Sequence, residues 1–130
     1  MQIQFVDSVE PANNTTLSEG DAEQLRQILH RLRMAEAARI CILHHENGFD
    51  LTFGVGDQAA GVQFASSDGM PPYLVAINDG SVTGDHAFYF DTSYTEFAER
   101  HCISFDNLLL VVVHFLEAGG RTELVLWEEI

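Results

Sequence analysis

Three consecutive residues, His44, His45 and Glu46, have side chains of the types that bind zinc. They end an apolar run, ICIL, that has the composition of a β-strand. Successive side chains of a strand point to opposite faces, so only His44 and Glu46 can share one face. A metal site would need further histidines from distant parts of the chain, and the HExxH spacing is absent. A histidine-dependent metal enzyme is thus one alternative, and the sequence identifies no metal ligand, cofactor or catalytic residue.

Other short patterns resemble catalytic motifs but lack the residues that those motifs require. GVGDQAAG (54–61) has alanine where a dinucleotide-binding loop has its third glycine, and GSVTG (80–84) lacks the nucleophilic serine of GxSxG. The chain has no lysine, which excludes a Walker A loop and lysine Schiff-base catalysis. Asp79 and Asp85 flank GSVTG as a potential acid–base pair, but acids in glycine-rich segments more commonly form turns. We therefore predict that the protein is not an enzyme.

Charge is the strongest compositional signal. The formal net charge is −14, from 20 acids and 6 arginines. Four arginines lie in the first forty residues, whereas nine acids and no Lys or Arg lie between Arg39 and Arg100. A field of this sign repels nucleic acid and anionic membranes and attracts a basic partner. The charge alone is equally compatible with a role in solubility.

The length of 130 residues, with 46% hydrophobic residues, predicts a single globular domain spanning residues 1–130. Cys41 and Cys102 have apolar neighbours and no CxxC spacing, so we expect buried free thiols. The chain begins without the basic flank and apolar run of a signal peptide, and no apolar stretch reaches the ~20 residues that span a bilayer. These features predict a soluble, cytoplasmic protein.

The first forty residues predict a strand and an amphipathic helix. QIQFV (2–6) has strand character, and the segment that follows is rich in turn residues. Ser18 and Asp21 resemble a capping box, and apolar residues then recur at helical spacing to about residue 37.

Residues 38–91 predict antiparallel strands joined by turns. Runs of strand length at 38–45, 50–55, 60–66, 73–78 and 86–91 alternate with segments rich in Gly, Asp, Asn and Pro. Residues 93–103 are ambiguous, and we expect a strand with an irregular end.

The C-terminal part predicts a buried helix and a final strand. Ser104 is a good N-cap, and Gly119 and Gly120 stand where a left-handed residue ends a helix, so we expect a helix over 105–118. TELVLW (122–127) alternates like a strand, with Trp127 as a core anchor. The expected fold class is α+β: an antiparallel β-meander with an N-terminal amphipathic helix and a buried C-terminal helix before the last strand.

The chain end resembles the Imm1 family of bacterial immunity proteins. The shared pattern is a helix with Phe-Leu, a small residue, Gly, Arg, a hydrophobic strand with Trp, and an acid. The matching residues are Phe115, Leu116, Ala118, Gly119, Arg121, Val125, Trp127 and Glu128. LTFGV (51–55) and AAGVQFAS (59–66) resemble the family's paired central strands, and HAFYFD (86–91) resembles its strand before the acidic turn, so the likeness covers about 50–130. Thr122 departs from it, because the family often has proline after the arginine.

This resemblance implies a non-enzymatic inhibitor that binds a cognate secreted toxin, with a nucleic-acid deaminase as the leading partner. An acidic surface would then occupy the toxin's basic substrate groove, with no direct contact to nucleic acid or membrane. The expected contacts are acids and aromatic anchors in the turns between the central strands. These residues are Asp57, Asp68, Tyr73, Asp79, Asp85, Asp91 and Tyr94. A general acidic interaction module remains an alternative, and Arg121 either pairs with an acid or binds carbonyls at the helix end.

Overall fold

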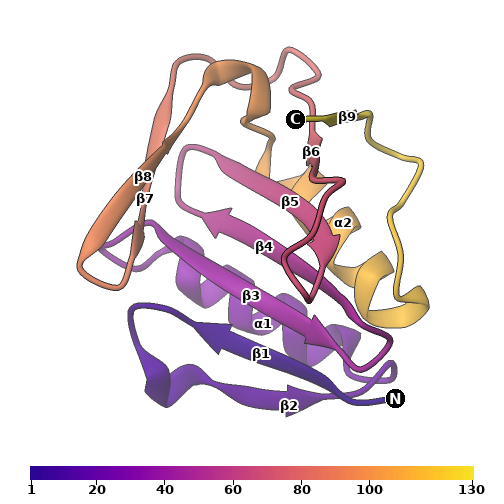
Figure 1. Ribbon diagram of the computed structural model, residues 1–130. Helices are drawn as coiled ribbons and strands as arrows, with labels where there is room; N and C mark the ends of the chain where they lie inside the picture. The colour runs from indigo at the N-terminus through magenta and orange to yellow at the C-terminus, as the bar shows by residue number, and fades with distance from the viewer.

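The computed structural model describes residues 1–130 and has an α+β fold with two α-helices and nine strands (Figure 1). The helices are α1 (Ala22–Arg33) and α2 (Phe105–Ala118). The strands are β1 (Ile3–Asp7), β2 (Thr15–Leu17), β3 (Arg39–His45), β4 (Phe49–Val55), β5 (Ala60–Ser66), β6 (Leu74–Ala76), β7 (His86–Phe90), β8 (Ser93–Phe97) and β9 (Trp127–Glu129). The predicted fold class is confirmed.

The sheet has the order β2-β1-β3-β4-β5-β6-β9, and its neighbouring strands are antiparallel. Both helices pack on one face of it (Figure 1). The β7–β8 hairpin leaves this path and joins the sheet through one parallel pairing, Arg39 with Tyr89. The meander is therefore largely as predicted, and the hairpin is its exception.

The α1 helix presents one apolar stripe to the sheet, with Leu25, Ile28, Leu29 and Leu32 buried. It is shorter than the expected 18–37. The N–H and hydroxyl of Ser18 donate to the Asp21 carboxylate, at 2.8 and 3.1 Å, so the helix begins after Asp21.

The α2 helix has the predicted bounds because both of its ends are specified by neighbouring residues. Ser104 Oγ accepts a hydrogen bond from the N–H of Asn107 at 3.1 Å. Gly119 adopts φ +74° and donates its N–H to the Phe115 carbonyl at 2.8 Å. Seven residues of α2 are buried in the main core, which confirms the predicted buried helix. Neither helix is long and apolar enough to cross a membrane.

Two strand predictions were wrong in position. The turn-rich segment after β1 contains β2, which pairs with β1 at the edge of the sheet. The last strand covers Trp127–Glu129 and not 122–127, because its partner β6 offers only three residues for pairing. The predicted alternation still holds before the strand, since Val125 is buried while Leu124 and Leu126 are exposed.

Trp127 is partly buried against the main core, as expected for an anchor, and its indole N–H donates to the Thr122 carbonyl at 2.9 Å. Neither role expected for Arg121 is observed. Its guanidinium lies over the rings of Phe64 and Trp127, 5.5 and 6.0 Å from their centroids. The cysteines Cys41 and Cys102 are free and buried, as predicted, and burial raises the pKa of both thiols.

A buried ion pair joins β1 to β3. The Arg39 side chain is 2% exposed, and its Nη1 lies 3.0 Å from Asp7 Oδ2 and 2.7 Å from Glu10 Oε1. Burial opposes ionisation of Asp7, but hydrogen bonds from Asn13, the N–H groups of Glu10 and Val9, and Arg39 hold its pKa below the ordinary value. Arg39 is also the residue of β3 whose backbone pairs with Tyr89 of β7, so this cluster lies where the hairpin joins the sheet.

Candidate partner-binding face

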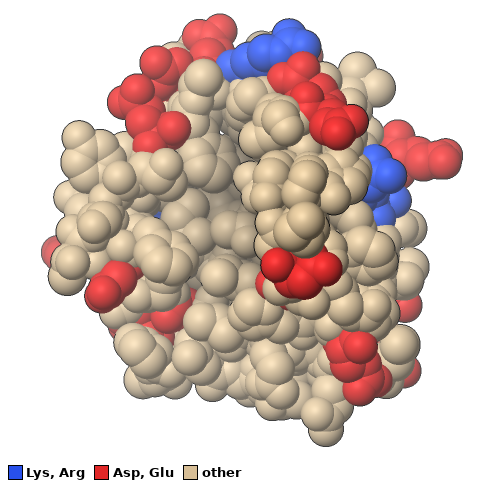
Figure 2. Space-filling model, in the orientation of Figure 1, with Lys and Arg blue, Asp and Glu red and all other residues tan.

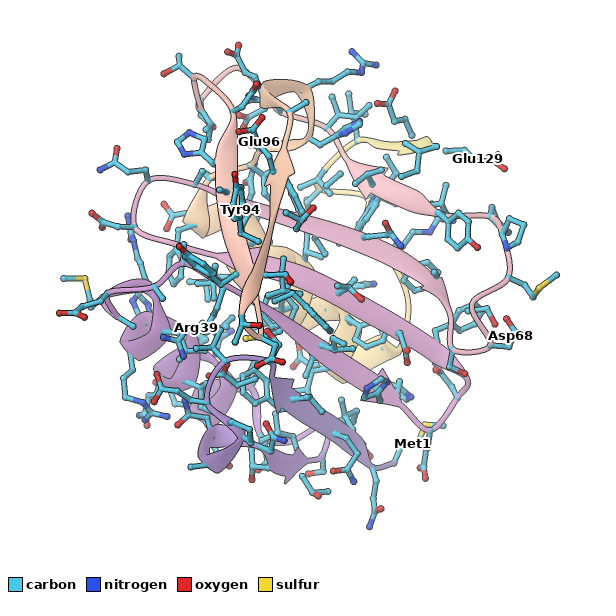
Figure 3. All side chains as sticks on the ribbon, turned by 60° about the vertical axis from the view of Figure 1, so that its left-hand side comes forward. Met1, Arg39, Asp68, Tyr94, Glu96 and Glu129 are labelled. Atoms are coloured by element: carbon cyan, nitrogen blue, oxygen red, sulfur yellow. The ribbon has the colours of Figure 1, made fainter.

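The sheet face opposite the helices is partly covered by the β7–β8 hairpin, which crosses it as Figure 3 shows. Gly54 of β4 and Gly61 of β5 are directly paired beneath the hairpin. A Cβ added to Gly54 would lie 2.7 Å from the Phe88 ring, and one added to Gly61 would overlap Phe97. The two rings contact each other edge to face, with centroids 5.1 Å apart. Two glycines thus provide the space in which two phenylalanines fix the hairpin on the sheet.

The hairpin carries exposed aromatic side chains. Tyr89, Phe90 and Tyr94 are 45, 48 and 66% exposed, and the rings of Tyr89 and Tyr94 have centroids 6.1 Å apart. Figure 3 shows Tyr94 and Glu96 on the hairpin's outward side, and Asp91 lies in its turn. Exposed aromatic side chains are typical of protein interfaces, in which aromatic anchors provide much of the binding energy.

An open groove of about 280 Å³ lies between the hairpin and the C-terminal edge of the sheet. Figure 2 shows the surface hollowed between the hairpin on the left and the β5–β6 loop on the right. Its lining residues are Gln63, Val75, Thr95, Glu96, Phe97, Ala98, His101 and Ile130. The groove gives the face a concave region that a projecting segment of another protein can enter.

The basic groups next to this groove are paired with an acid. Arg100 donates two hydrogen bonds to Glu128, at 2.8 and 2.7 Å, and His101 Nε2 contacts the same carboxylate. The Arg100 and His101 contacts lower the pKa of Glu128 to about 2. Glu96 has no such partner. The groove therefore offers a partner one unpaired carboxylate and no unpaired guanidinium.

The seven residues expected to contact a partner lie in four segments of the chain. Asp91 and Tyr94 lie on the hairpin, and Asp79 and Asp85 lie in the connection that leads to it. Asp57 lies in the β4–β5 turn, with its carboxylate 3.9 Å from Arg33.

Asp68 and Tyr73 lie in the β5–β6 loop, and Figure 3 shows Asp68 across the sheet face from Tyr94. The Tyr73 hydroxyl donates to the Gly69 carbonyl within the same loop. The structure thus places these two residues on one side of the groove and the hairpin residues on the other.

Three of these acids also stabilise the loops that carry them. Asp68 accepts from the N–H of Met70 at 2.9 Å, which lowers the pKa of Asp68. Asp79 accepts from the N–H of Ser81 at 3.0 Å, and hydrogen bonds from Ser81 likewise lower its pKa. Asp85 accepts from the N–H of Glu99 at 2.8 Å. The turn-forming role considered for Asp79 and Asp85 is therefore present in the structure, alongside any contact to a partner.

Sequence reasoning missed the glycine–phenylalanine contact and the exposed Tyr89, Phe90 and Glu96. The alternation in HAFYF was a usable signal, because it separates Phe88 on the inner side from Tyr89 on the outer side. Nothing local indicated that Gly54 and Gly61 would be neighbours beneath them.

The segment His44-His45-Glu46 does not form a metal site in the structure. His44 and His45 lie on opposite faces of β3, as strand geometry predicted: His44 Nδ1 lies 2.9 Å from Asp50, and the ring of His45 packs against Phe115. No group of three or more histidine, cysteine or acidic side chains is placed to hold a metal ion.

A protein-family model covers most of the chain. The family model described as immunity protein Imm1 matches residues 13–129. The match begins before β2 and includes α1, so it extends well upstream of the resemblance seen over 50–130. No curated protein matches the chain.

Proposed function

Since the chain belongs to the Imm1 family of immunity proteins, which are non-enzymatic and neutralise a cognate toxin, we propose that it does so through its hairpin face. The toxin proposed is a nucleic-acid-acting domain, such as a deaminase, with a basic substrate groove. The acidic face covers that groove and keeps substrate phosphates out of it. The protein performs this role in the cytoplasm, where a toxin would reach the nucleic acid.

One observation carries this proposal: exposed aromatics and acids occur together on the hairpin, next to a groove with no unpaired basic group. A nucleic-acid-binding toxin needs Lys and Arg to contact phosphates, and these side chains complement such a surface. The net charge of −14 also accelerates encounter with a basic partner at low ionic strength.

We place Asp91 and Tyr94 at the centre of the contact, with Asp79 and Asp85 beside the base of the hairpin. Asp57 extends the acidic surface along the β4–β5 turn. Asp68 and Tyr73 contact the toxin from the opposite side of the groove. Each role is a proposal supported by the positions described above.

The test is co-expression with the toxin domain encoded beside this protein, followed by binding measurements on a catalytically inactivated toxin. We expect restored growth and a complex that weakens as salt is raised. Asp91→Ala should weaken binding by about 2–5 kcal/mol if the carboxylate is buried against a toxin arginine. Glu117→Ala is the matched control, because it removes one exposed charge from α2 on the other side of the sheet.

Two results would contradict the proposal. A salt-insensitive complex that leaves the toxin's substrate groove open would refute the occlusion mechanism. Near-neutral alanine variants at all five aspartates would refute this choice of surface. The five are Asp57, Asp68, Asp79, Asp85 and Asp91.

A further inference from the structure

Strand β8 has one unpaired edge. It pairs only with β7, with Phe88 opposite Thr95 and Tyr89 opposite Tyr94. The N–H of Tyr89 donates away from β8, to the Ala38 carbonyl at 2.8 Å. Tyr89 and Tyr94 therefore form a non-hydrogen-bonded pair, since such pairs alternate with hydrogen-bonded ones in an antiparallel ladder. The N–H and C=O groups of Tyr94 and, two residues later, Glu96 point to the free edge.

This edge borders the open groove. Thr95, Glu96 and Phe97 form one wall, Gln63 and Val75 lie on the sheet beneath, and Ile130 lines the groove as well. Figure 3 shows β8 on the side of the hairpin that is nearer β6. An extended chain beside β8 would thus have backbone partners on one side and sheet residues below it.

The other free edges offer less. Strands β2 and β9 each have three residues, whereas β8 has five. A longer edge gives more main-chain hydrogen bonds to an added strand.

Charge identifies the kind of segment that fits. Glu96 is exposed and has no ion-pair partner, and Asp91 lies in the hairpin turn that precedes β8. A second copy of this chain would bring another net charge of −14 and repel the first. Charged residues on edge strands also discourage pairing between identical edges. A basic segment is attracted by this charge and is not repelled by the acids at the edge. Tyr94 also provides a ring on which an arginine can stack.

We propose that β8 accepts an extended, basic segment of the cognate toxin as an added strand. The N–H and C=O groups of Tyr94 and Glu96 bond to the segment's backbone, and Glu96 pairs with a Lys or Arg on it. This inference rests on the proposed function, because it names the part of the hairpin face that holds the toxin.

The first measurement is amide hydrogen exchange by NMR on the unmodified protein, alone and bound to the inactivated toxin domain encoded beside it. In the free protein the amides of Tyr94 and Glu96 should exchange rapidly, whereas Thr95 is already protected by β7. In the complex the exchange rates of both edge amides should fall by at least about tenfold, because each amide then donates a backbone hydrogen bond that must open before exchange. A stable complex with both amides still unprotected overturns this inference and leaves the proposed function standing. Absence of any complex overturns both.

Variants separate backbone pairing from side-chain contact. Glu96→Pro removes an edge N–H together with the carboxylate, whereas Glu96→Ala removes only the carboxylate. We expect Glu96→Pro to bind the toxin about tenfold more weakly than Glu96→Ala, the loss due to one backbone hydrogen bond. Ala87→Pro is the control, because Ala87 lies opposite Glu96 and its N–H points to the other edge of the hairpin. Equal affinities of the folded Pro and Ala variants at Glu96 would overturn the inference.

Discussion

Asp7→Asn should destabilise the protein strongly, because it leaves the buried Arg39 with a reduced set of partners. Asp7 is 1% and Arg39 2% exposed, so neither group has water as an alternative partner. Removing one partner of a buried ion pair costs about 3–5 kcal/mol. Glu10 remains 2.7 Å from Arg39 Nη1, which favours the lower end of this range. We therefore expect a loss of about 3 kcal/mol.

Thermal unfolding followed by circular dichroism measures this change. The entropy of unfolding expected for this length is about 0.27 kcal/mol/K, so a loss of 3 kcal/mol lowers Tm by roughly 11 °C. Glu10→Gln is the control, because the Glu10 side chain is 56% exposed and its pair with Arg39 should contribute less than about 1 kcal/mol. Replacing both buried partners, as Asp7→Asn with Arg39→Met, should recover much of the loss.

The pH dependence provides an independent check on the same pair. The pKa of Asp7 is lower in the folded protein than its ordinary value of 3.8. Its ionised form therefore contributes stability that is present above about pH 4 and is lost as pH falls through the folded pKa. This part of the acid dependence should be absent from Asp7→Asn. A Tm change no larger than that of Glu10→Gln would refute the account of the cluster.

Three further predictions follow from the hairpin and its surroundings. Gly61→Ala should displace Phe97 and cost about 1–3 kcal/mol by overpacking, measured by urea unfolding, whereas the same change at Gly120, where an added Cβ meets no neighbouring atom, should cost less. Phe88→Ala should cost about 3–5 kcal/mol in the same assay, because the ring is 1% exposed. Glu128→Gln should flatten the acid dependence of Tm between about pH 4.5 and 2. The folded pKa of Glu128 is about 2, so its ionised form contributes stability that is lost as pH falls through this window. An unchanged slope would contradict the pairing of Glu128 with Arg100.

The elements that sequence reasoning placed well are those whose signals are local. The bounds of α2 were correct because Ser104 and Gly119 act on residues within one turn of themselves. The α1 helix was overextended because Ser18 looks like an N-cap in sequence, whereas in the structure it donates to Asp21. The last strand was misplaced because pairing depends on the length of β6, about fifty residues earlier in the chain.

The candidate site was harder to predict because its parts meet only in the folded chain. The acids and tyrosines were chosen for residue type and their position in turns, which says nothing about which turns share a surface. The positions of Phe88 over Gly54 and of Phe97 over Gly61 depend on contacts across more than thirty residues. The buried pairing of Arg39 with Asp7 spans 32 residues in the same way.

The two sides of the hairpin are under different constraints, and this affects how such a protein can evolve. Phe88 and Phe97 face the sheet and are held by close contact with glycines, so substitutions there alter the fold. Tyr89, Tyr94 and Glu96 alternate with them and contact mainly solvent, so they can be exchanged at little cost to stability. If the inner side is retained while residues on the outer side change, the same fold can bind a toxin whose sequence changes, or bind a different toxin.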